Sequence, residues 1–382
     1  MPVFAFGSNG SGQLGIGHDE DVSVPTRCDF DGPEPTLSSS TTPGSSMSRS
    51  VRIAAGGNHT ILLCPDGTVY SAGCNEDGRC GRPPSNEPQV QFCRVTVEDG
   101  QSSHRRFQHV AATWEATVLV TDAPHEHGDH AGEDMVYVLG SGGKGELGLG
   151  EGCTRATTPA RIPDFPPRGT RIVSLASGMG HTVAVLSNGE VYGWGAARKG
   201  QLGESAKGRK VAWRPVKVDP VPFYVTDAAC GREFTVLIGD KAAGQFTVLG
   251  SADNKWNIVS GCPAPPDRLR GFRGIAASWH GVYVHQDDSS LVAWGRNDRG
   301  QLPPADLLKA KEMAVGSEHV LALVGPRAVV AFGWGEHGNC GPDTDAQGNV
   351  KERCGEVPLP SEGGNEIVGL GAGCATSWVI MS

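Results

Sequence analysis

The chain is poor in aromatic residues, in basic charge and in long apolar runs. Aromatic residues make up 6% of its 382 residues, and 33 Lys and Arg stand against 42 Asp and Glu, which gives a formal net charge of −9. No segment approaches the roughly 18 apolar residues that a membrane-spanning helix requires. An acidic balance of this size also disfavours general binding to nucleic acid or to anionic membranes. We therefore expect no membrane partner and no direct contact with nucleic acid.

Signals of secretion, disulfide bonding and catalysis are missing as well. The N-terminal residues MPVFAFGSNG contain neither the basic nor the long apolar segment of a secretory signal, so we expect an intracellular protein. The eleven cysteines are odd in number and form no C-x-x-C pair, which favours reduced, partly buried thiols over a disulfide framework. The sequence also has no Gly-x-Ser-x-Gly elbow and no His-Glu-x-x-His zinc motif. It thus predicts a protein that is not an enzyme and that holds no cofactor or metal.

Glycine, by contrast, is abundant, and its distribution reveals a repeat. The chain has 55 glycines spread along its length, and residues 53–81 align without a gap on residues 175–203. Each copy contains an apolar strand, a glycine turn, a second apolar strand, a tight turn and a third strand that ends in glycine. The tight turns, Asp-Gly at 66–67 and Asn-Gly at 188–189, suit the positive φ angles of a two-residue hairpin. The repeat is therefore an antiparallel sheet unit of about fifty residues.

The unit occurs seven times. Its loop glycine recurs at Gly7, Gly73, Gly140, Gly195, Gly250, Gly295 and Gly333. The chain begins in the second half of a unit, at 3–7, and ends in a first half, at 367–373. We therefore expect an all-β, seven-bladed β-propeller that is closed by pairing of the N-terminal and C-terminal strands. We assign residues 1–382 to a single β-propeller domain, with flexible insertions near 31–50 and 122–134.

The repeat loops resemble those of a known family. Residues 7–15 (GSNGSGQLG), 180–182 (GHT) and 294–302 (WGRNDRGQL) are similar to repeats of the regulator of chromosome condensation family, and the similarity covers essentially the whole chain. The resemblance implies a seven-bladed propeller. It leaves the function open, because propellers of this family serve as exchange factors for the small GTPase Ran, as ligase modules, as an ultraviolet photoreceptor and as scaffolds.

Residues 4–21 and the bare-propeller length resemble a fungal subgroup of this family, whose members are accessory factors also known from toxin insensitivity. That resemblance implies a non-catalytic propeller that forms a heterodimer with a small zinc-binding electron-carrier protein of diphthamide synthesis. It also implies an indirect role with Elongator in the modification of wobble uridines in tRNA, in the cytoplasm and nucleus. The alternative is a guanine-nucleotide exchange factor for a Ran-like small GTPase. The chromatin-bound exchange factor carries a basic tail before its propeller, whereas the first strand here is expected to start at residue 3.

Two sets of residues in the glycine turns stand out. His59, His181 and His319 occupy equivalent positions, so we expect each to donate a hydrogen bond that satisfies a buried carbonyl of a neighbouring blade. Trp114 and Trp279 instead replace a small turn residue with the largest one, and large aromatic and arginine side chains are typical of interaction hot spots. We predict a partner-binding surface formed by Trp114, Glu115, Arg232, Glu233, Trp279, His280 and Glu318. Ordinary packing of the two tryptophans is the alternative.

Two insertions have unusual compositions. Residues 36–50 are rich in Ser and Thr, which indicates a flexible loop and a candidate phosphorylation target. The segment HEHGDH at 125–130 has imidazoles that could bind a transition metal. We interpret it as a surface insertion, because loops tolerate added polar residues.

Overall fold

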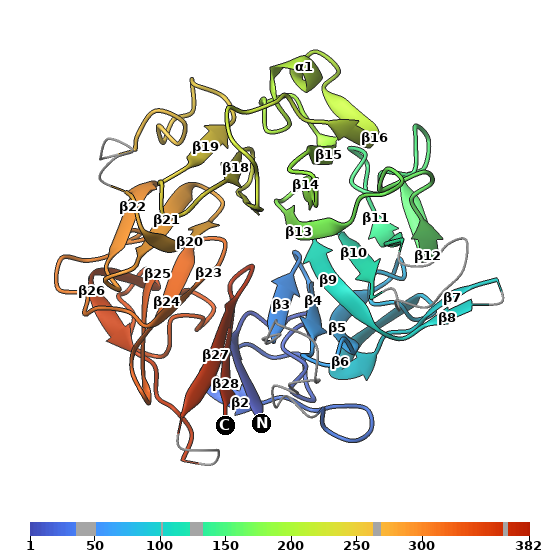
Figure 1. Ribbon diagram of the computed structural model, residues 1–382. Coiled ribbons are helices and arrows are strands. Elements are labelled where there is room, and N and C mark those ends of the chain that lie inside the picture. The colour runs from blue at the N-terminus through green and yellow to red at the C-terminus, as the bar shows by residue number, and fades with distance from the viewer. Residues whose placement is uncertain (36–50, 101, 123–132, 263–268, 362–365) are drawn as a thin grey trace, which may run out of the picture.

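The computed structural model describes residues 1–35, 51–100, 102–122, 133–262, 269–361 and 366–382 (Figure 1). The predicted flexible insertions at 31–50 and 122–134 lie mostly outside the described residues, and the histidine-rich segment 125–130 lies wholly outside them. Nearly all regular structure is β-strand, and seven sheets are arranged radially around one axis. The chain is an all-β, seven-bladed propeller, as the repeat predicts.

The blades are numbered here in chain order. Within each blade, the strands are given from the one nearest the axis outward. Blades 1 to 4 have four strands each: β27 (Ile367–Ala372), β28 (Thr376–Met381), β1 (Val3–Gly7) and β2 (Val22–Arg27); β3 (Arg52–Ala55), β4 (His59–Leu63), β5 (Val69–Asn75) and β6 (Ser85–Arg94); β9 (Phe107–Ala112), β10 (Ala116–Thr121), β11 (Val136–Ser141) and β12 (Arg155–Arg161); β13 (Ile172–Ser177), β14 (His181–Leu186), β15 (Val191–Ala196) and β16 (Val211–Lys217).

Blades 5 and 6 have three strands each among the described residues, and blade 7 has four: β17 (Asp227–Cys230), β18 (Thr235–Ile238) and β19 (Phe246–Leu249); β20 (Phe272–Ala277), β21 (Gly281–Gln286) and β22 (Leu291–Gly295); β23 (Glu312–Val315), β24 (His319–Gly325), β25 (Ala328–Trp334) and β26 (Asn349–Glu356). A ribbon of β7 (Val97–Asp99) and β8 (Ser102–His104) and the short helix α1 (Glu204–Lys207) lie outside the blades. No helix in the described part of the chain has the length and the apolar run that a membrane crossing requires.

The two ends of the chain share blade 1, which confirms the predicted closure. Strand β1 pairs antiparallel with β28 over five residue pairs, from Val3 opposite Ile380 to Gly7 opposite Thr376. In Figure 1 the N- and C-termini lie side by side at the edge of this blade. The ring therefore has no open sheet face between its first and last repeats.

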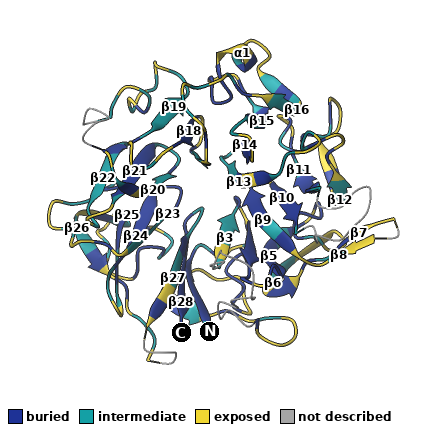
Figure 2. Ribbon diagram, in the orientation of Figure 1, coloured by how far each residue is buried: buried dark blue, intermediate teal, exposed yellow. Residues whose placement is uncertain are grey.

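The core lies between neighbouring blades, which pack face to face. The second strand of a blade is the most buried: all six residues of β10 and all six of β14 are buried. Trp194 and Trp378 are fully buried in two of these interfaces. Figure 2 shows the resulting gradient from buried strands to exposed loops at the rim. Burial of these apolar side chains is the main term that holds the blades together.

The glycine at or near the end of the third strand is required by geometry in six blades. These six have φ between 95° and 123°: Gly7, Gly73, Gly140, Gly195, Gly295 and Gly333. A Cβ atom at Gly195 would overlap the carbonyl oxygen of Gly180, and the N–H of Ala196 donates to that same oxygen at 2.7 Å. Glycine therefore allows the turn before the second strand to meet the loop after the third. Gly250 of blade 5 is the exception, since its φ is not positive.

The third strands of blades 5 and 6 are less covered than those of the other blades. All four residues of β19 and four of the five in β22 are half-buried, whereas four of the six residues of β15 in blade 4 are buried. After β22 the described chain continues through Pro303 and Pro304 and forms no fourth strand.

Candidate interaction face

The turns between first and second strands all lie at one end of the axis. In blade 4, for example, His181 at the start of β14 pairs with Gly195 at the end of β15, so the loop after β15 lies at the same end. We call this end of the ring the turn face. The central residues of its seven turns are Gly57, Trp114, Met179, Arg232, Trp279, Ser317 and Cys374.

Hydrogen bonds between neighbouring turns fix both tryptophan backbones. The N–H of Trp114 donates to the carbonyl of Met179 at 3.0 Å. Trp279 is held on both sides, because its N–H donates to Ser317 O at 2.9 Å and its carbonyl accepts from Arg232 N at 3.1 Å. The two indoles therefore project from a main chain that is anchored in adjacent blades.

Trp114 and Trp279 meet across the axis, although blades 3 and 6 are not neighbours. Their ring centroids are 5.8 Å apart and their planes are inclined by 46°. The Arg232 guanidinium lies 5.6 Å from the Trp279 ring centroid, a cation–π contact. Gly57 lies flat against the other indole, since a Cβ atom there would be 2.7 Å from Trp114 Cδ2. The structure thus brings three of the predicted residues into one aromatic and cationic group, in which the two tryptophans are half-buried and Arg232 is exposed.

The other four predicted residues follow these positions in their turns and differ in accessibility. Glu115 and Glu233 are exposed, and His280 is half-buried. Glu318 is buried, with 5% of its surface exposed. It therefore supports the turn face from within instead of projecting from it. Binding of a partner to any of the seven residues stays a prediction.

Glu318 is the centre of a buried polar network. Its carboxylate accepts hydrogen bonds from Gln301 Nε2 at 2.7 Å and from Arg296 Nη1 at 2.9 Å, and it contacts His280 Nδ1 at 3.1 Å. Burial alone would raise the pKa of Glu318, but the hydrogen bonds from His280 and Gln301 and the charge of Arg296 hold that pKa below its usual value. The network therefore keeps Glu318 ionised and fixes the orientation of His280 beside the tryptophan pair.

Trp256 extends the aromatic and cationic group toward the rim, and it was not among the residues predicted from the sequence. The ammonium group of Lys255 lies 4.4 Å from its ring centroid and the guanidinium of Arg296 lies 5.3 Å from it. The His280 ring lies 6.4 Å away. Two signals were present in the repeat: Lys255 replaces a loop glycine, and Arg296 directly follows another. Neither signal shows that the two loops touch.

The three equivalent histidines form a structural relay between blades. His59 Nε2 lies 2.9 Å from the Thr117 hydroxyl of the next blade, and that hydroxyl donates to the carbonyl of Arg79 at 2.8 Å. The histidine therefore reaches the carbonyl through a hydroxyl, and not directly as the sequence predicts. His181 and His319 make the same 2.9 Å contact with Thr235 and Ser377. Burial lowers the pKa of His59 to about 3 and that of His181 and His319 to about 4.

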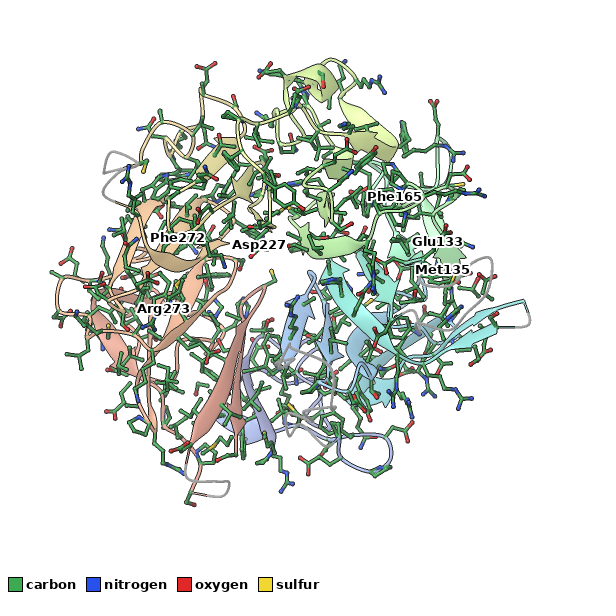
Figure 3. All side chains as sticks on the ribbon, in the orientation of Figure 1. Glu133, Met135, Phe165, Asp227, Phe272 and Arg273 are labelled. Atoms are coloured by element: carbon green, nitrogen blue, oxygen red, sulfur yellow. The ribbon has the colours of Figure 1, made fainter. Side chains whose placement is uncertain are left out.

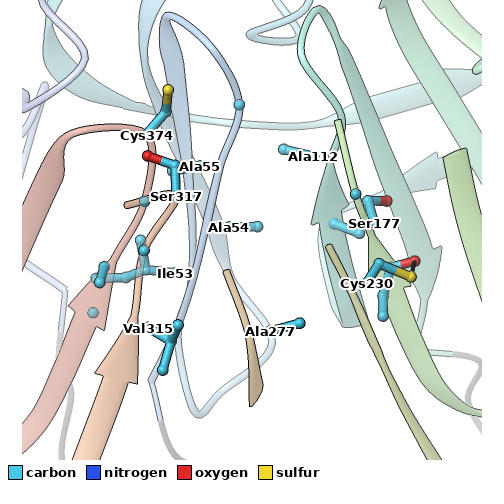
Figure 4. A pocket seen from close by; sticks show the side chains of 18 of the residues that line it. Ile53, Ala54, Ala55, Ala112, Ser177, Cys230, Ala277, Val315, Ser317 and Cys374 are labelled. Atoms are coloured by element: carbon cyan, nitrogen blue, oxygen red, sulfur yellow. Dashed lines mark hydrogen bonds between the residues drawn. The ribbon is translucent and has the colours of Figure 1, made fainter. Parts of the chain in front are cut away.

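A central cavity of about 470 Å³ runs along the axis below the tryptophan pair (Figure 4). Small side chains of the inner strands line it, among them Ala54, Ala112, Ser177 and Ala277. Its thiols are poor nucleophiles, because burial raises the pKa of Cys230 to about 12. Among the described residues, no three His, Cys, Asp or Glu side chains are grouped so as to hold a metal ion. The cavity therefore offers space but no evident reactive group.

A second cavity, of about 660 Å³, lies at the outer edge of blade 3. Figure 3 places its lining residues Glu133, Met135 and Phe165 at the periphery, far from Asp227 at the inner side of the ring. Asp134 also lines it, and burial raises the pKa of this carboxyl group. Its Oδ2 atom accepts the N–H of Ile172 from blade 4 at 2.6 Å. The Asp134 carboxyl group thus links blade 3 to blade 4 and has a structural role.

Comparisons with known proteins agree with this fold. The sequence profile described as the RCC1-like domain matches residues 2–379. An RCC1 repeat-containing protein of Schizosaccharomyces pombe is 29% identical, over 99% of this chain and 98% of its own. The secretion-regulating guanine nucleotide exchange factor of Bos taurus is 28% identical, over 97% of this chain and 81% of its own. The crystal structure of human WBSCR16 superposes with a TM-score of 0.74 at 18% identity and covers 100% of both chains, and it supports the fold alone.

Proposed function

Because the chain belongs to the RCC1-like domain family, we propose that it is a non-catalytic docking propeller that binds a protein partner through its turn face. The observation that carries this proposal is the contact of Trp114 with Trp279 at the axis, with Arg232 beside them. Tryptophan and arginine dominate interaction hot spots, where they combine large contact area with directional polar groups. These side chains are half-buried or exposed, so a partner would complete their burial.

The partner that we propose is a small zinc-binding, electron-carrying protein, with which the propeller forms a heterodimer in the cytoplasm and nucleus. Through that partner the propeller would support diphthamide synthesis and, with Elongator, the modification of wobble uridines in tRNA. Support comes from the resemblance of residues 4–21 to the fungal accessory factors. Direct contact with nucleic acid is not part of the proposal.

A second candidate function is guanine-nucleotide exchange on a Ran-like small GTPase. It is favoured by the relative from Bos taurus, which is named as a guanine nucleotide exchange factor and is 28% identical over 97% of this chain. An exchange factor accelerates nucleotide release from its GTPase, whereas a docking subunit of a zinc protein does not. The two candidates therefore make opposite predictions in one assay.

Affinity capture with the full chain, followed by mass spectrometry and by a nucleotide-release assay on the captured protein, tests both candidates. We expect a small zinc protein in stoichiometric amount, and we expect the Trp114→Ala/Trp279→Ala variant to lose it. Tyr224→Ala is the matched control, because Tyr224 is an aromatic residue with 56% of its surface exposed and hydrogen-bonds Ser187 at the opposite end of the ring. Capture of a small GTPase with accelerated nucleotide release and no zinc protein would reverse the assignment.

A further inference from the structure

One loop of the turn face carries a charge opposite to that of the chain. Residues 196–214 hold six Lys and Arg and one acidic residue, Glu204, in a protein whose net charge is −9. We call the six cationic residues the basic ridge: Arg198, Lys199, Lys207, Arg209, Lys210 and Arg214. Five of the six lie in the loop between β15 and β16, which includes α1 at the outer rim of blade 4, and Arg214 lies in β16 itself (Figure 1).

The basic ridge is exposed and largely without acidic partners. Five of its six residues are exposed, and Lys207 is half-buried. Among the described residues, one ridge residue forms an ion pair: Lys207 Nζ lies 3.1 Å from Glu204 Oε1. Some exposed cations elsewhere lie beside carboxylates, as in the pairs of Arg353 with Asp343 and Lys309 with Asp288. Among the described residues, carboxylates therefore neutralise the positive charge of the ridge only in part, through Glu204 and through Asp219, which accepts the N–H of Ser205 at 3.0 Å.

The ridge is also held in one shape by its own backbone. Ala197 N donates to Lys210 O at 2.9 Å, which closes the loop, and Arg209 N donates to Ala206 O at 3.0 Å. Ala206 is buried with 3% of its surface exposed, and the amide N–H of Lys199 donates to Gln201 Oε1 at 2.9 Å. The loop that presents these cations needs little ordering when a partner binds.

The opposite sector of the turn face is acidic. The loop between β1 and β2 presents Asp19, Glu20 and Asp21 in succession, all exposed. Asp21 also accepts the N–H of Asn9 at 2.6 Å and contacts His337 Nδ1 of blade 7 at 2.7 Å. Blade 1 is separated from blade 4 by two blades on one side and three on the other. The face therefore carries positive charge on one side of the tryptophan pair and negative charge on the other.

We propose that the basic ridge is a docking surface for an acidic segment of the partner protein. This inference rests on the docking function proposed above and adds the charge pattern that the partner must carry. A cationic sector recruits carboxylates and orients the encounter, while the acidic sector rejects the reversed orientation. An RNA that spanned the face would bring phosphates against residues 19–21, whereas a short acidic segment stays within the ridge. The charge distribution thus favours a protein over a nucleic acid.

The test measures binding of two fluorescent probes to the full chain by anisotropy. One probe is a twelve-residue peptide rich in Asp and Glu, and the other is a single-stranded RNA of twelve nucleotides. The ridge variant is Lys199→Glu/Arg209→Glu. The matched control, Arg105→Glu/Arg106→Glu, changes the net charge equally at two exposed arginines near the opposite end of the ring.

We expect the acidic peptide to bind the native chain with an affinity that falls as salt is added. The ridge variant should bind it at least about tenfold more weakly, and the control variant should bind like the native chain. Equal peptide binding by all three proteins would overturn the proposal. Tighter binding of the RNA, lost in the ridge variant, would also overturn it and would assign the ridge to nucleic acid.

Failure of the ridge and failure of the docking function are distinguishable. The peptide assay does not depend on the tryptophan pair, and partner capture by the Trp114→Ala/Trp279→Ala variant does not depend on the ridge. Capture that is lost in the tryptophan variant but kept in the ridge variant leaves docking intact and removes the ridge from the interface.

Discussion

Blades 4 and 5 are neighbours built from the same repeat, and they differ in nearly every feature that defines it. Blade 4 has four strands, a buried His181 and a loop glycine, Gly195, with φ of 100°. Blade 5 has three strands among the described residues, Phe234 in place of the histidine and Gly250 without a positive φ. Yet each blade fills one of the seven positions of the ring.

The difference shows which parts of the repeat hold the ring and which parts refine it. Both blades keep a first and a second strand, and the second strands β14 and β18 are wholly buried. Inter-blade packing therefore persists when the histidine, the strained glycine and the outer strand are lost together. The turn of blade 5, which lacks these features, places Arg232 beside the Trp279 ring. The irregular blade 5 thus supplies the cationic residue of the tryptophan group on the turn face.

The largest expected effect is on stability at acidic pH, because blades 2, 4 and 7 contain the histidine that blade 5 lacks. Burial lowers the pKa of His181 and His319 to about 4 and that of His59 to about 3. Below pH of about 6.5 the unfolded chain binds protons that the folded chain excludes, so stability is complete above that pH and falls as the pH drops toward 4. We expect a loss of roughly 1–2 kcal/mol per histidine between pH of about 7 and about 5, measured by urea unfolding.

The carboxyl groups of Glu146 and Glu312 act in the opposite sense, because burial raises their pKa. A His181→Gln variant isolates the histidine contribution. Its pH dependence should be shallower than that of the native chain, and an unchanged slope would refute the assignment.

Gly195→Ala should destabilise the protein by about 3 kcal/mol or more, since it adds a strained φ and an overlap with the carbonyl oxygen of Gly180. Gly250→Ala is the matched variant in blade 5. Its nearest neighbour would be Phe234 Cβ at 3.0 Å, and no positive φ is involved. We expect about 1 kcal/mol there. Equal losses in chemical denaturation would mean that the two loops are not different in the way described.

His181→Ala should cost about 2 kcal/mol, because it removes the hydrogen bond to Thr235 and leaves a cavity in the interface of blades 4 and 5. The converse substitution sharpens the comparison. In blade 5, Phe234→His alone should be destabilising, and adding Val282→Thr should recover part of the loss by rebuilding the relay with blade 6. A double-mutant cycle measures this coupling, and additive losses would argue against a relay.

The smallest expected change in stability is that of Trp279→Ala, about 1 kcal/mol, because the side chain is half-buried and supported mainly by Trp114 and Arg232. Trp194→Ala is the contrasting variant, since Trp194 is fully buried and should cost about 3–5 kcal/mol. Thermal melts of both variants rank them. If Trp279→Ala proved as destabilising as Trp194→Ala, with partner capture unchanged, the tryptophan pair would be core and not interface.

Sequence reasoning recovered the ring because each unit carries local signals that survive without knowledge of the fold. Asn188 and Gly189 mark a hairpin, Gly195 marks a strained loop, and the partial units at both ends mark the shared blade. These signals depend on backbone geometry within a few residues, so they can be seen in a single chain.

The site was recovered only in part, because its contacts join residues that are far apart in sequence. Equivalent repeat positions placed Trp114 and Trp279 on one level, but their contact across the axis depends on side-chain direction. Glu318 and Glu115 are both glutamates at equivalent repeat positions, but only Glu115 is exposed. Glu318 is buried because Arg296 and Gln301, from the loop of the preceding blade, hydrogen-bond its carboxylate. The run of basic residues at 196–214 is visible in the sequence, but its place opposite the acidic loop at 19–21 depends on the order of the blades around the ring.

Pairing of β1 with β28 sets the order in which the protein can be assembled. Val3 is synthesised long before its partner Ile380, because all the other blades lie between them in the chain. During synthesis the edge of β1 therefore stays unpaired on the β28 side until the six other blades have been made. Loss of Thr376–Met381 from the C-terminal end would leave β1 without that neighbour and would free β27 as well. Residues Thr376–Met381 thus close the ring, and a chain truncated before them would expose unpaired strands to aggregation and proteolysis.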